Sequence, residues 1–455
     1  MSEGQQGYIW NSLFDTLLAI DNKGALRPNA AQTWQYSDAG RTLTLKLREG
    51  MEFSTGAPVN AAAVKASLDR TRETPGQQQG KLASIESIEG PADLTVVLRL
   101  RTPDASLLSS LAQAAGVIGD PATLDQKRTT LNPVGSGPYV LDKSTVNGST
   151  YVLKKRSDYW NAKAYPFQTL RIRVLADPTA SLNALQTHEV DAATVPAQQA
   201  GKVKAAGFQI KRVNATAIGN LVLADREGKL LKPLAEPKVR QAINMAFDRE
   251  KIVKQILQGA GQPSAQLFNP KGDAYDAGLE QTYPYDPAEA KRLMAEAGYP
   301  NGFSVTMPSL AFAKPFEPTI SQSLADIGIK VKWEPVPPQN TISAVTSKQY
   351  PMFFFIDGLN TTARAASDNF SELGFLNPFG SKDAQLTQLM GEAGSESDPA
   401  RAAARFKAVN AFAVENAWDA PIFYVGTTWA TKKGVTYLGD GSNTVNSVRV
   451  FGLSG

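Results

Sequence analysis

The chain has 455 residues, and its 47 Lys and Arg against 43 Asp and Glu leave a formal net charge of +4. This length exceeds what one hydrophobic core normally supports, so two or three domains are expected. Hydrophobic content of 42% and charged content of 20% exclude a disordered or fibrous chain. The small net charge, with basic and acidic residues interspersed, argues against a nucleic-acid partner.

The first third of the chain alternates strand and turn signals. Leu43, Leu45 and Leu47 alternate with polar residues, as do the apolar residues of 94–100, so both stretches predict half-buried strands. Between them Asn60 is placed to cap a helix that carries apolar residues at helical spacing. These signals predict a small mixed α and β domain.

The stretch NPVGSGPYVL, residues 132–141, raises the question of a phosphate-binding glycine loop. Such a loop needs free backbone N–H groups that lead into a helix, with Lys and Ser or Thr to follow. Here Pro138 removes a donor, and Tyr139, Val140 and Leu141 are typical of a strand. The stretch is therefore interpreted as a tight turn that enters a strand.

After this turn, residues 151–153 and the alternating Leu170, Ile172 and Val174 predict two further strands. The basic cluster 154–156 follows the first of them and is interpreted as a solvated strand end. Asp177 then begins a capped helix.

Two amphipathic helices are predicted farther along the chain. Residues 236–247 place an apolar face at helical spacing, with Pro237 in the first turn. In residues 286–298, Asp286 is the N-cap, Glu289 completes a capping box and Gly298 ends the helix.

A strand at 303–307, a helix that ends near Gly328 and a strand at 330–333 follow in strand–helix–strand order. This order predicts a largely parallel sheet covered by helices. No internal repeat and no low-complexity linker separates the parts. A chain that passes between lobes more than once would give this pattern.

The chain contains no Cys and a single His, His188. This excludes thiolate nucleophiles, disulfides and the usual zinc ligand sets, and we expect no metal and no cofactor. His188 is expected in a surface turn, and a Ser-His-Asp hydrolase or a histidine-based nickel site would depend on it alone. A chain without Cys fits an exported bacterial protein that avoids disulfide errors.

No apolar run approaches the ~20 residues that span a bilayer, and the strongest, 352–356, has the length of a strand. The start Met1–Gly7 is interpreted as an artificial start joined to a mature sequence, from which an export signal or a lipid-anchoring cysteine has been removed.

Seven segments share one family's pattern and order: Leu13–Leu18, Leu26–Trp34, Leu45–Phe53, Ala57–Val64, Gly135–Tyr139, Val239–Arg249 and Leu293–Phe303. Together they resemble the large solute-binding proteins that serve ABC importers, of the peptide/nickel-type class that includes some oligosaccharide binders. The resemblance implies an α/β, two-lobed fold like that of class II periplasmic binding proteins, with an extra small α+β domain and a ligand cleft between the lobes. In that family the Gly-x-Gly-Pro-Tyr turn is structural.

The resemblance also implies a division of the chain. Lobe I would comprise 1–34, 137–228 and the C-terminal return 430–455, with the small accessory domain at 35–136 and lobe II at 229–429. The ligand would contact both lobes only when they close about a hinge, so binding would shift the equilibrium toward the closed form.

In peptide binders of this family a carboxylate after a lobe II strand receives the ligand's α-amino group. The corresponding strand here is 350–356, and two alignments of the loop that follows are open: one gives the acid position to Asn360, the other to Asp357. Arg364 and Asp368 on the same predicted loop, and Phe355 on the strand, are further candidates. The usual Asp-Pro before Asn-Phe is missing, so a hydroxyl-rich solute, served by Asn and Asp acceptors beside aromatic rings, remains open beside a peptide.

Four aromatic residues and one amide complete the predicted ligand-binding set: Trp10, Asn11, Trp418, Tyr424 and Trp429. The resulting hypothesis is a non-enzymatic, monomeric receptor outside the cytoplasm, periplasmic or lipid-anchored. It would deliver a peptide or an oligosaccharide to an ABC permease. The alternatives are a secreted hydrolase that uses paired carboxylates and a sensor or chaperone on the same scaffold.

Overall fold

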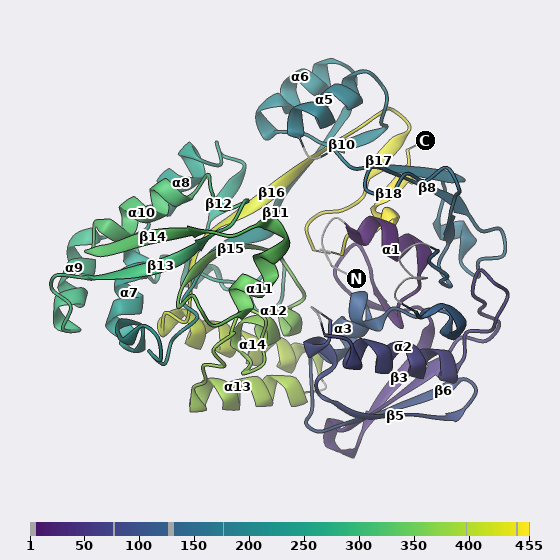
Figure 1. Cartoon of the computed structure of the whole chain (residues 1–455), viewed down its shortest axis with the longest axis horizontal. Coiled ribbons are helices and arrows are strands. Elements are labelled where there is room, and N and C mark those ends of the chain that lie inside the picture. Colours follow the sequence, from purple (N-terminus) through teal and green to yellow (C-terminus); the bar gives the residue numbers. More distant parts are fainter. Residues whose placement is uncertain are drawn as a thin grey trace. The chain divides into compact units, whose positions relative to one another are not determined.

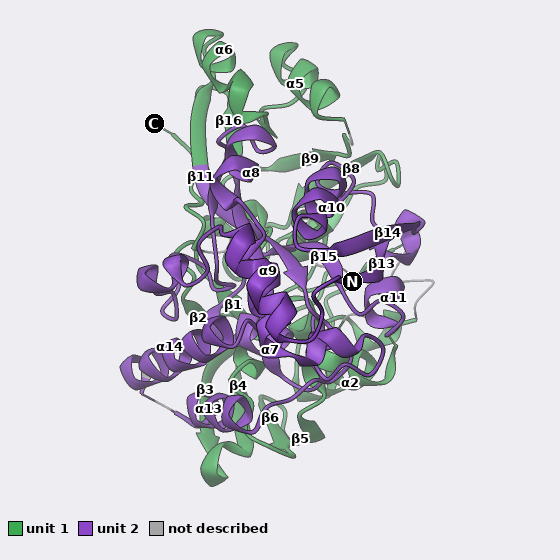
Figure 2. Ribbon diagram, turned by 90° about the vertical axis from the view of Figure 1, so that its left-hand side faces the viewer, with its two compact units in different colours: residues 1–212, 428–455 green, residues 213–427 purple. Residues whose placement is uncertain are grey.

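The computed structural model describes residues 6–75, 78–125, 132–175, 177–396, 398–442 and 445–454. Residues 1–5, most of the predicted artificial start, lie outside these ranges. The chain forms two compact units, one of residues 1–212 with 428–455 and the other of residues 213–427, coloured separately in Figure 2. Within the described residues, no helix combines the length and the apolar character that crossing a membrane requires.

The chain passes between the units along two strands, β11 (Gln209–Val222) and β16 (Ala420–Thr431). The units divide at 212/213 and 427/428, whereas the lobe boundaries were expected at 228/229 and 429/430. Because both crossings lie inside continuous strands, no turn or linker marks them in the sequence.

A four-stranded antiparallel sheet in unit 1 has the order β3-β4-β6-β5. Its strands are β3 (Ala31–Ser37), β4 (Thr42–Leu47), β5 (Ile85–Ala92) and β6 (Thr95–Leu100). The alternating leucines of β4 are buried, and α2 (Ala61–Glu73) begins where Asn60 accepts a hydrogen bond from the Ala63 N–H at 3.0 Å. The predicted strands and the capped helix between them are therefore confirmed.

The remaining elements of unit 1 are short (Figure 1). They are α1 (Gly7–Leu13), β1 (Leu18–Ile20), β2 (Leu26–Pro28), α3 (Leu107–Leu111), β7 (Tyr139–Leu141), β8 (Thr150–Lys155), β9 (Thr169–Arg173), α5 (Pro178–Gln186), β10 (Ala192–Thr194), α6 (Ala200–Ala205), β17 (Val435–Tyr437) and β18 (Phe451–Leu453). The Asp177 carboxylate accepts from the N–H groups of Thr179 and Ala180, which confirms the predicted cap of α5.

The glycines of residues 132–141 allow two parts of the backbone to approach closely. A Cβ on Gly135 would lie 2.1 Å from the Leu13 carbonyl oxygen, and one on Gly137 would lie 2.5 Å from the Leu13 carbonyl carbon. The Gly137 N–H donates to that oxygen at 3.0 Å, and Tyr139 begins β7. The stretch is a structural turn, as predicted.

The basic cluster 154–156 is only partly a solvated strand end, because Arg156 is buried. Its guanidinium donates to the carbonyl oxygens of Glu52 and Phe53 at 3.2 and 3.3 Å, and to that of Gly137 at 3.4 Å. The side chain thus ties the glycine turn to a neighbouring loop. The local pattern could not reveal this, because Glu52 and Phe53 lie 104 and 103 residues away from Arg156 along the chain.

Unit 2 contains most of the helices. Its elements are α7 (Pro237–Met245), α8 (Arg249–Gln255), β12 (Gly261–Pro263), α9 (Pro287–Glu296), β13 (Phe303–Ser309), α10 (Glu317–Ala325), β14 (Ile329–Pro335), α11 (Thr341–Thr346), β15 (Phe353–Gly358), α12 (Thr362–Phe370), α13 (Ala384–Ser395) and α14 (Pro399–Glu415). The predicted helices and strands between 236 and 333 are all confirmed, with ends shifted by a few residues.

The prediction of a largely parallel sheet is wrong. Strand–helix–strand order does give the parallel pair β13–β14, joined by α10. The five-stranded sheet, however, has the order β10-β16-β11-β15 with β12 on β16, and the pairs β10–β16, β11–β15 and β12–β16 are antiparallel. Its strands come from distant parts of the chain, so local order did not indicate their direction.

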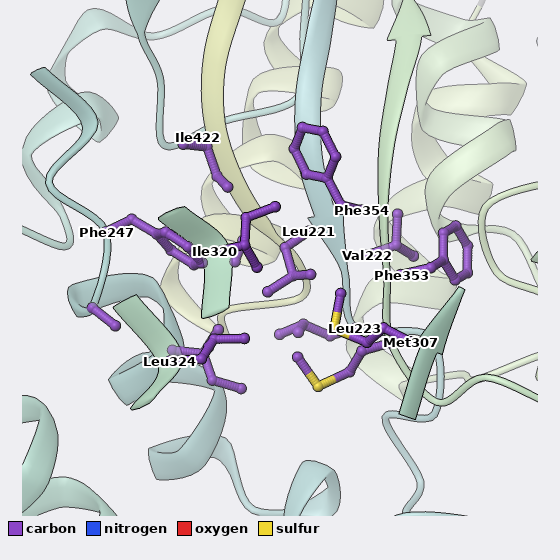
Figure 3. Packing of buried hydrophobic residues seen from close by; sticks show 14 of the residues in the cluster. Leu221, Val222, Leu223, Phe247, Met307, Ile320, Leu324, Phe353, Phe354 and Ile422 are labelled. Atoms are coloured by element: carbon purple, nitrogen blue, oxygen red, sulfur yellow. The ribbon is translucent and has the colours of Figure 1, made fainter. Parts of the chain in front are cut away.

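The core of unit 2 lies where β11, β13, β15 and α10 converge (Figure 3). The apolar face predicted for α7 enters it, because Val239, Ala242, Ile243 and Ala246 are all at most 1% exposed. Phe247, just past that helix, is fully buried, a contribution of about 1.5–3 kcal/mol for one side chain. This core supports β15 and the residues that follow it.

Candidate functional site

A small hollow in unit 2 collects several of the predicted ligand residues. It is lined by Ile218, Asn220, Val222, Leu267, Phe355, Asp357, Gly358, Leu359, Asn360, Ala365, Asn369 and Leu376. β11 and β15 supply its floor, since Asn220 is opposite Phe355 and Ile218 is opposite Asp357 in the antiparallel register. The volume is about 10 Å³, close to the space of one water molecule.

Two buried amide side chains that line this hollow have oxygen atoms without a hydrogen-bond donor in the described part of the chain. Asn220 and Asn369 are 3% and 5% exposed, and within the described residues the Oδ1 atom of each accepts no hydrogen bond. The Asn369 Nδ2 donates to the Ala365 carbonyl at 2.8 Å. A buried acceptor without a donor costs about 1–3 kcal/mol. Two such acceptors at one hollow suit a solvent or solute molecule that carries N–H or O–H groups.

Asp357 is the last residue but one of β15, and Asn360 follows two residues beyond the strand. Both are half-buried, and both line the hollow. The Asn360 Nδ2 donates to the Gly358 carbonyl at 3.3 Å. The structure therefore brings together the two residues between which the sequence alignment left the acid position open.

The segment after Asp357 is not the long loop that was expected, because α12 occupies most of it. Arg364 and Asp368 lie one turn apart on this helix and form a buried ion pair, with the Arg364 Nε 2.7 Å from the Asp368 Oδ2. An i, i+4 pair of this kind stabilises a helix. The expectation of a long loop, which supported the proposal of Arg364 as a ligand residue, is therefore wrong, and the roles of Arg364 and Asp368 toward a solute stay predictions.

Three of the predicted aromatic residues lie in hydrophobic cores. Trp10 is 7% exposed in unit 1, and Trp418 is 5% exposed with the Arg226 guanidinium 4.8 Å from its ring centre. Tyr424 is fully buried and its hydroxyl donates to the carbonyl oxygens of Gln266 and Phe268, so burial raises its pKa well above the usual value. Their ring faces are covered by protein.

Trp429 is half-buried and lies in an aromatic cluster of unit 1. Its ring stacks on Tyr437 at 5.0 Å between centroids and meets Tyr8 and Phe451 edge-on. The cluster ties β16 to β17 and β18. These ring contacts explain the position of Trp429 by packing, and its role toward a solute stays a prediction.

A larger hollow of about 220 Å³ lies within unit 1. It is lined by Asn11, Asp15, Thr16, Ala19, Ile20, Asp21, Asn22, Asn29, Ala112, Ala164, Tyr165, Val445, Ser447, Arg449 and Val450. Asn11 is the predicted ligand residue among them. Asp15 and Arg449 were missed, although Asp15 belongs to the segment Leu13–Leu18 that carries the family resemblance.

The carboxyl of Asp15 in this hollow is buried and strongly perturbed. Its Oδ1 accepts from the Tyr159 hydroxyl at 2.8 Å and from the Asn29 Nδ2 at 3.3 Å. Burial raises its pKa to about 6, against the lowering effect of these hydrogen bonds and of the Arg449 charge. The carboxyl therefore changes charge near neutral pH.

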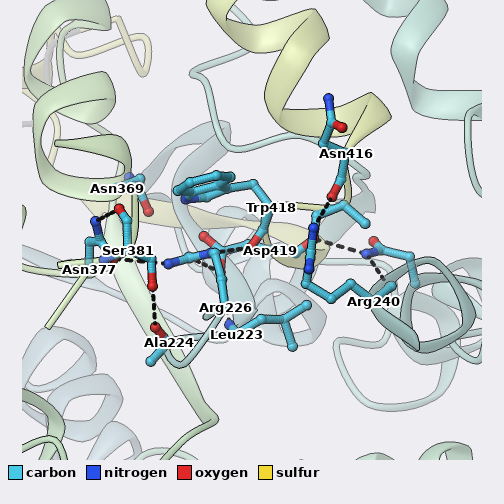
Figure 4. A network of polar contacts seen from close by, with 12 residues as sticks. Leu223, Ala224, Arg226, Arg240, Asn369, Asn377, Ser381, Asn416, Trp418 and Asp419 are labelled. Carbon is cyan, nitrogen blue, oxygen red and sulfur yellow. Dashed lines mark hydrogen bonds and ion pairs between the residues drawn. The ribbon is translucent and has the colours of Figure 1, made fainter. Parts of the chain in front are cut away.

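A second buried acid, Asp419, belongs to a structural network of unit 2 (Figure 4). The Arg226 guanidinium donates to the Asp419 carboxylate at 2.6 Å and to the Asn377 Oδ1 at 3.1 Å. Asp419 in turn accepts from the Leu223 N–H at 2.8 Å. Burial raises the pKa of Asp419, and the Arg226 charge opposes that shift. The network joins three segments of unit 2 that are distant in the sequence.

No group of His, Cys, Asp and Glu side chains that could hold a metal ion occurs among the described residues. His188 is exposed in a turn with a φ of 58°, as predicted, and stacks on Phe208 at 5.5 Å.

The fold is that of periplasmic binding proteins. Over 98% of this chain and 94% of the other, it matches AgaA from A. tumefaciens R10 in complex with agropinic acid, with a TM-score of 0.83 and 25% identity. Over the whole chain and 94% of the other, it matches DppA from Helicobacter pylori in complex with the peptide STSA, with a TM-score of 0.84 and 23% identity. The predicted fold class is confirmed.

The chain belongs to family 5 of the bacterial extracellular solute-binding proteins, whose model matches residues 25–383. It is also 33% identical over 336 residues to the glutathione-binding protein GsiB of Escherichia coli K12. That match covers 71% of this chain. It covers 64% of the curated relative, which is less than two thirds of that protein's length. The family resemblance carried by the seven segments is confirmed.

Proposed function

We propose that this protein is the substrate-binding component of an ABC importer and that it captures a peptide-type solute. Membership of the extracellular solute-binding family supports the receptor role, and the similar proteins include one named for glutathione and one in complex with a peptide. The protein acts by binding, without turnover, and passes the solute to a permease. It works outside the cytoplasm as a monomer, free in the periplasm or lipid-anchored.

The hollow of unit 2 carries this proposal, because it joins Asp357 and Asn360 to two buried amide oxygens that lack donors. An ammonium group supplies three N–H donors. Asp357 adds a carboxylate to the lining of the hollow, and a charge-assisted bond to it would favour a solute with a free amino terminus. Phe355 supplies the apolar side of the hollow.

The binding experiment uses titration calorimetry with a panel of di- to tetrapeptides and their N-acetylated forms. Acetylation removes the charge and should weaken binding at least tenfold. The Asp357→Asn variant should lose this discrimination, since its side chain no longer carries a charge. Asp273→Asn, an exposed acid of the same unit, is the matched control and should bind as the unchanged protein does.

Equal affinity for free and acetylated peptides would overturn the role of Asp357. Melting curves of the ligand-free variants establish that each is folded. Conversion of the peptide during the titration would contradict capture without turnover and favour the hydrolase alternative.

A hydroxyl-rich solute is the second candidate, favoured by the amides of Asn220, Asn360 and Asn369 at one hollow. Amide oxygens accept from neutral O–H groups as well as from an ammonium. Binding of oligosaccharides, with no response to the peptide panel and little effect of Asp357→Asn, would select this candidate.

A further inference from the structure

The larger hollow, within unit 1, has no part in the proposed capture of a peptide by unit 2. Its lining comes from the start of the chain, from residues 112, 164 and 165, and from residues 445–450. With about 220 Å³ it is smaller than the 300–1,000 Å³ of ordinary sites for drug-sized ligands. A molecule of amino-acid size fits this space, and a long peptide does not.

The side chain of Arg449 belongs to the lining of this hollow. The side chain is half-buried, and its guanidinium carbon lies 5.8 Å from the ring centre of Tyr165. Its backbone N–H donates to the Ser447 Oγ, but within the described residues no acceptor takes a hydrogen bond from the guanidinium. An arginine fork with free donors is suited to bind a carboxylate through two parallel hydrogen bonds.

Asp15 contributes a carboxyl group to the lining of the same hollow. The two charges influence each other, yet in the described part of the chain no ion pair joins them. The other carboxyl of the lining, Asp21, is already engaged by the Arg27 guanidinium and by the N–H groups of Lys23 and Ala25. Asp15 and Arg449 are thus opposite charges that share one hollow and are separated within it.

A single anion would satisfy Arg449 but would be repelled by Asp15. A single cation would be attracted by Asp15 but repelled by Arg449. A molecule that carries both charges satisfies both ends at once, and the neutral polar groups of Asn11, Asn22 and Ser447 supply further hydrogen-bond partners along the lining.

We propose that the unit 1 hollow is a second binding site, which takes a small zwitterion of the amino-acid class. The carboxylate of the zwitterion bonds to the Arg449 guanidinium, and its ammonium group lies on the side of Asp15. The site is distinct from the unit 2 hollow, with which it shares no residue.

The test is titration calorimetry of the full chain at pH 7.5 with L-alanine and L-serine, and with acetate and ethylamine as probes that carry one charge each. The two amino acids should bind at least tenfold more tightly than either single-charge probe. Arg449→Gln should weaken binding of L-alanine at least tenfold, because it removes the charge and the fork. Arg171→Gln, an exposed arginine of the same unit, is the matched control and should have no effect.

If Arg449→Gln does not fold, Arg449→Lys is measured in its place. It keeps the charge but loses the paired donors, so it should still bind L-alanine more weakly than the unchanged protein does. Asp357→Asn should leave the affinity for L-alanine unchanged. Loss of peptide binding with retained L-alanine binding therefore separates this site from the proposed function.

Three results would overturn the zwitterion site. They are acetate binding as tightly as L-alanine, full affinity in Arg449→Gln, and a crystal structure at 20 mM L-alanine with water alone in the hollow.

Discussion

At the scale of single residues, Asp15 shows how far burial changes a familiar side chain. A free Asp carboxyl is charged at neutral pH, but here burial outweighs the hydrogen bonds from Tyr159 and Asn29 and raises the pKa to about 6. The sequence indicates only that Asp15 belongs to a family segment. Its partners lie 14 and 144 residues away along the chain, so its chemistry depends on the fold.

The raised pKa predicts a pH dependence of stability. Because the folded carboxyl holds its proton more tightly than the unfolded one, its contribution to the free energy of unfolding is fully present below pH 3.8. The contribution is lost as pH rises through about 6. The loss is about 3 kcal/mol at most, from 1.36 kcal/mol per pKa unit.

Asp15→Asn removes this titration. Urea unfolding of both proteins between pH 3.5 and 7.5 should show the free energy of unfolding of the unchanged protein falling relative to the variant up to about pH 6, with no further change above. Tyr159 donates to the same carboxyl but stays uncharged in this range, because burial raises its pKa well above the usual value. Parallel curves across the whole pH range would contradict the prediction.

At the scale of elements, the sequence predicts which residues cap the helices, but it does not predict hydrogen bonds to residues that are distant in the chain. Asp286 accepts from the N–H groups of Ala288 and Glu289 at 3.1 and 2.9 Å, and Gly298 has the positive φ of 89° that suits a residue just past a helix. The predicted capping box is incomplete, however. Glu289 pairs with Arg292, and the Asp286 N–H donates to the Met245 carbonyl.

The cap predicts a measurable effect of Asp286→Ala. Loss of two hydrogen bonds to the first turn of α9 should lower the free energy of unfolding by about 1 kcal/mol. Glu289→Ala is the control on the same turn and should have a much smaller effect, because its ion pair is exposed to solvent. Chemical denaturation of both variants checks this, and an equal loss in the two would refute the assignment of the cap to Asp286.

The secondary structure predicted for residues 357–370 is also wrong. Its polar sequence was interpreted as a loop, whereas Thr362–Phe370 is helical because Ala365, Ala366 and Phe370 pack inward and Arg364 pairs with Asp368. Propensity alone does not identify so short a helix, since tertiary packing supplies most of its stability.

At the scale of the whole molecule, unit 2 consists of one continuous segment of the chain, whereas unit 1 consists of two segments. All residues of the largest core cluster lie between 221 and 423, so unit 2 contains its own core. In unit 1, by contrast, β10 pairs with Trp429–Thr431 of β16, and β17 and β18 come from the C-terminal return.

This arrangement predicts that a fragment of residues 213–427 folds by itself. It should show a cooperative thermal transition and helical circular dichroism, because a core that is complete within one segment needs no other part of the chain. A fragment of residues 1–212 keeps the core cluster between Leu17 and Ile118 but lacks β17, β18 and the strand partner of β10, so its transition should occur at a lower temperature than that of the whole chain. A non-cooperative 213–427 fragment would contradict this.

The sequence by itself determined the family, the fold class and most of the local elements, because caps, glycines and apolar periodicity act between residues close in the chain. Only the tertiary structure decided the antiparallel sheet, the buried Arg156, the helix α12 and the presence of Asp15 and Arg449 in the lining of one hollow. These depend on residues that are distant in sequence and become neighbours when burial of apolar surface draws the chain together.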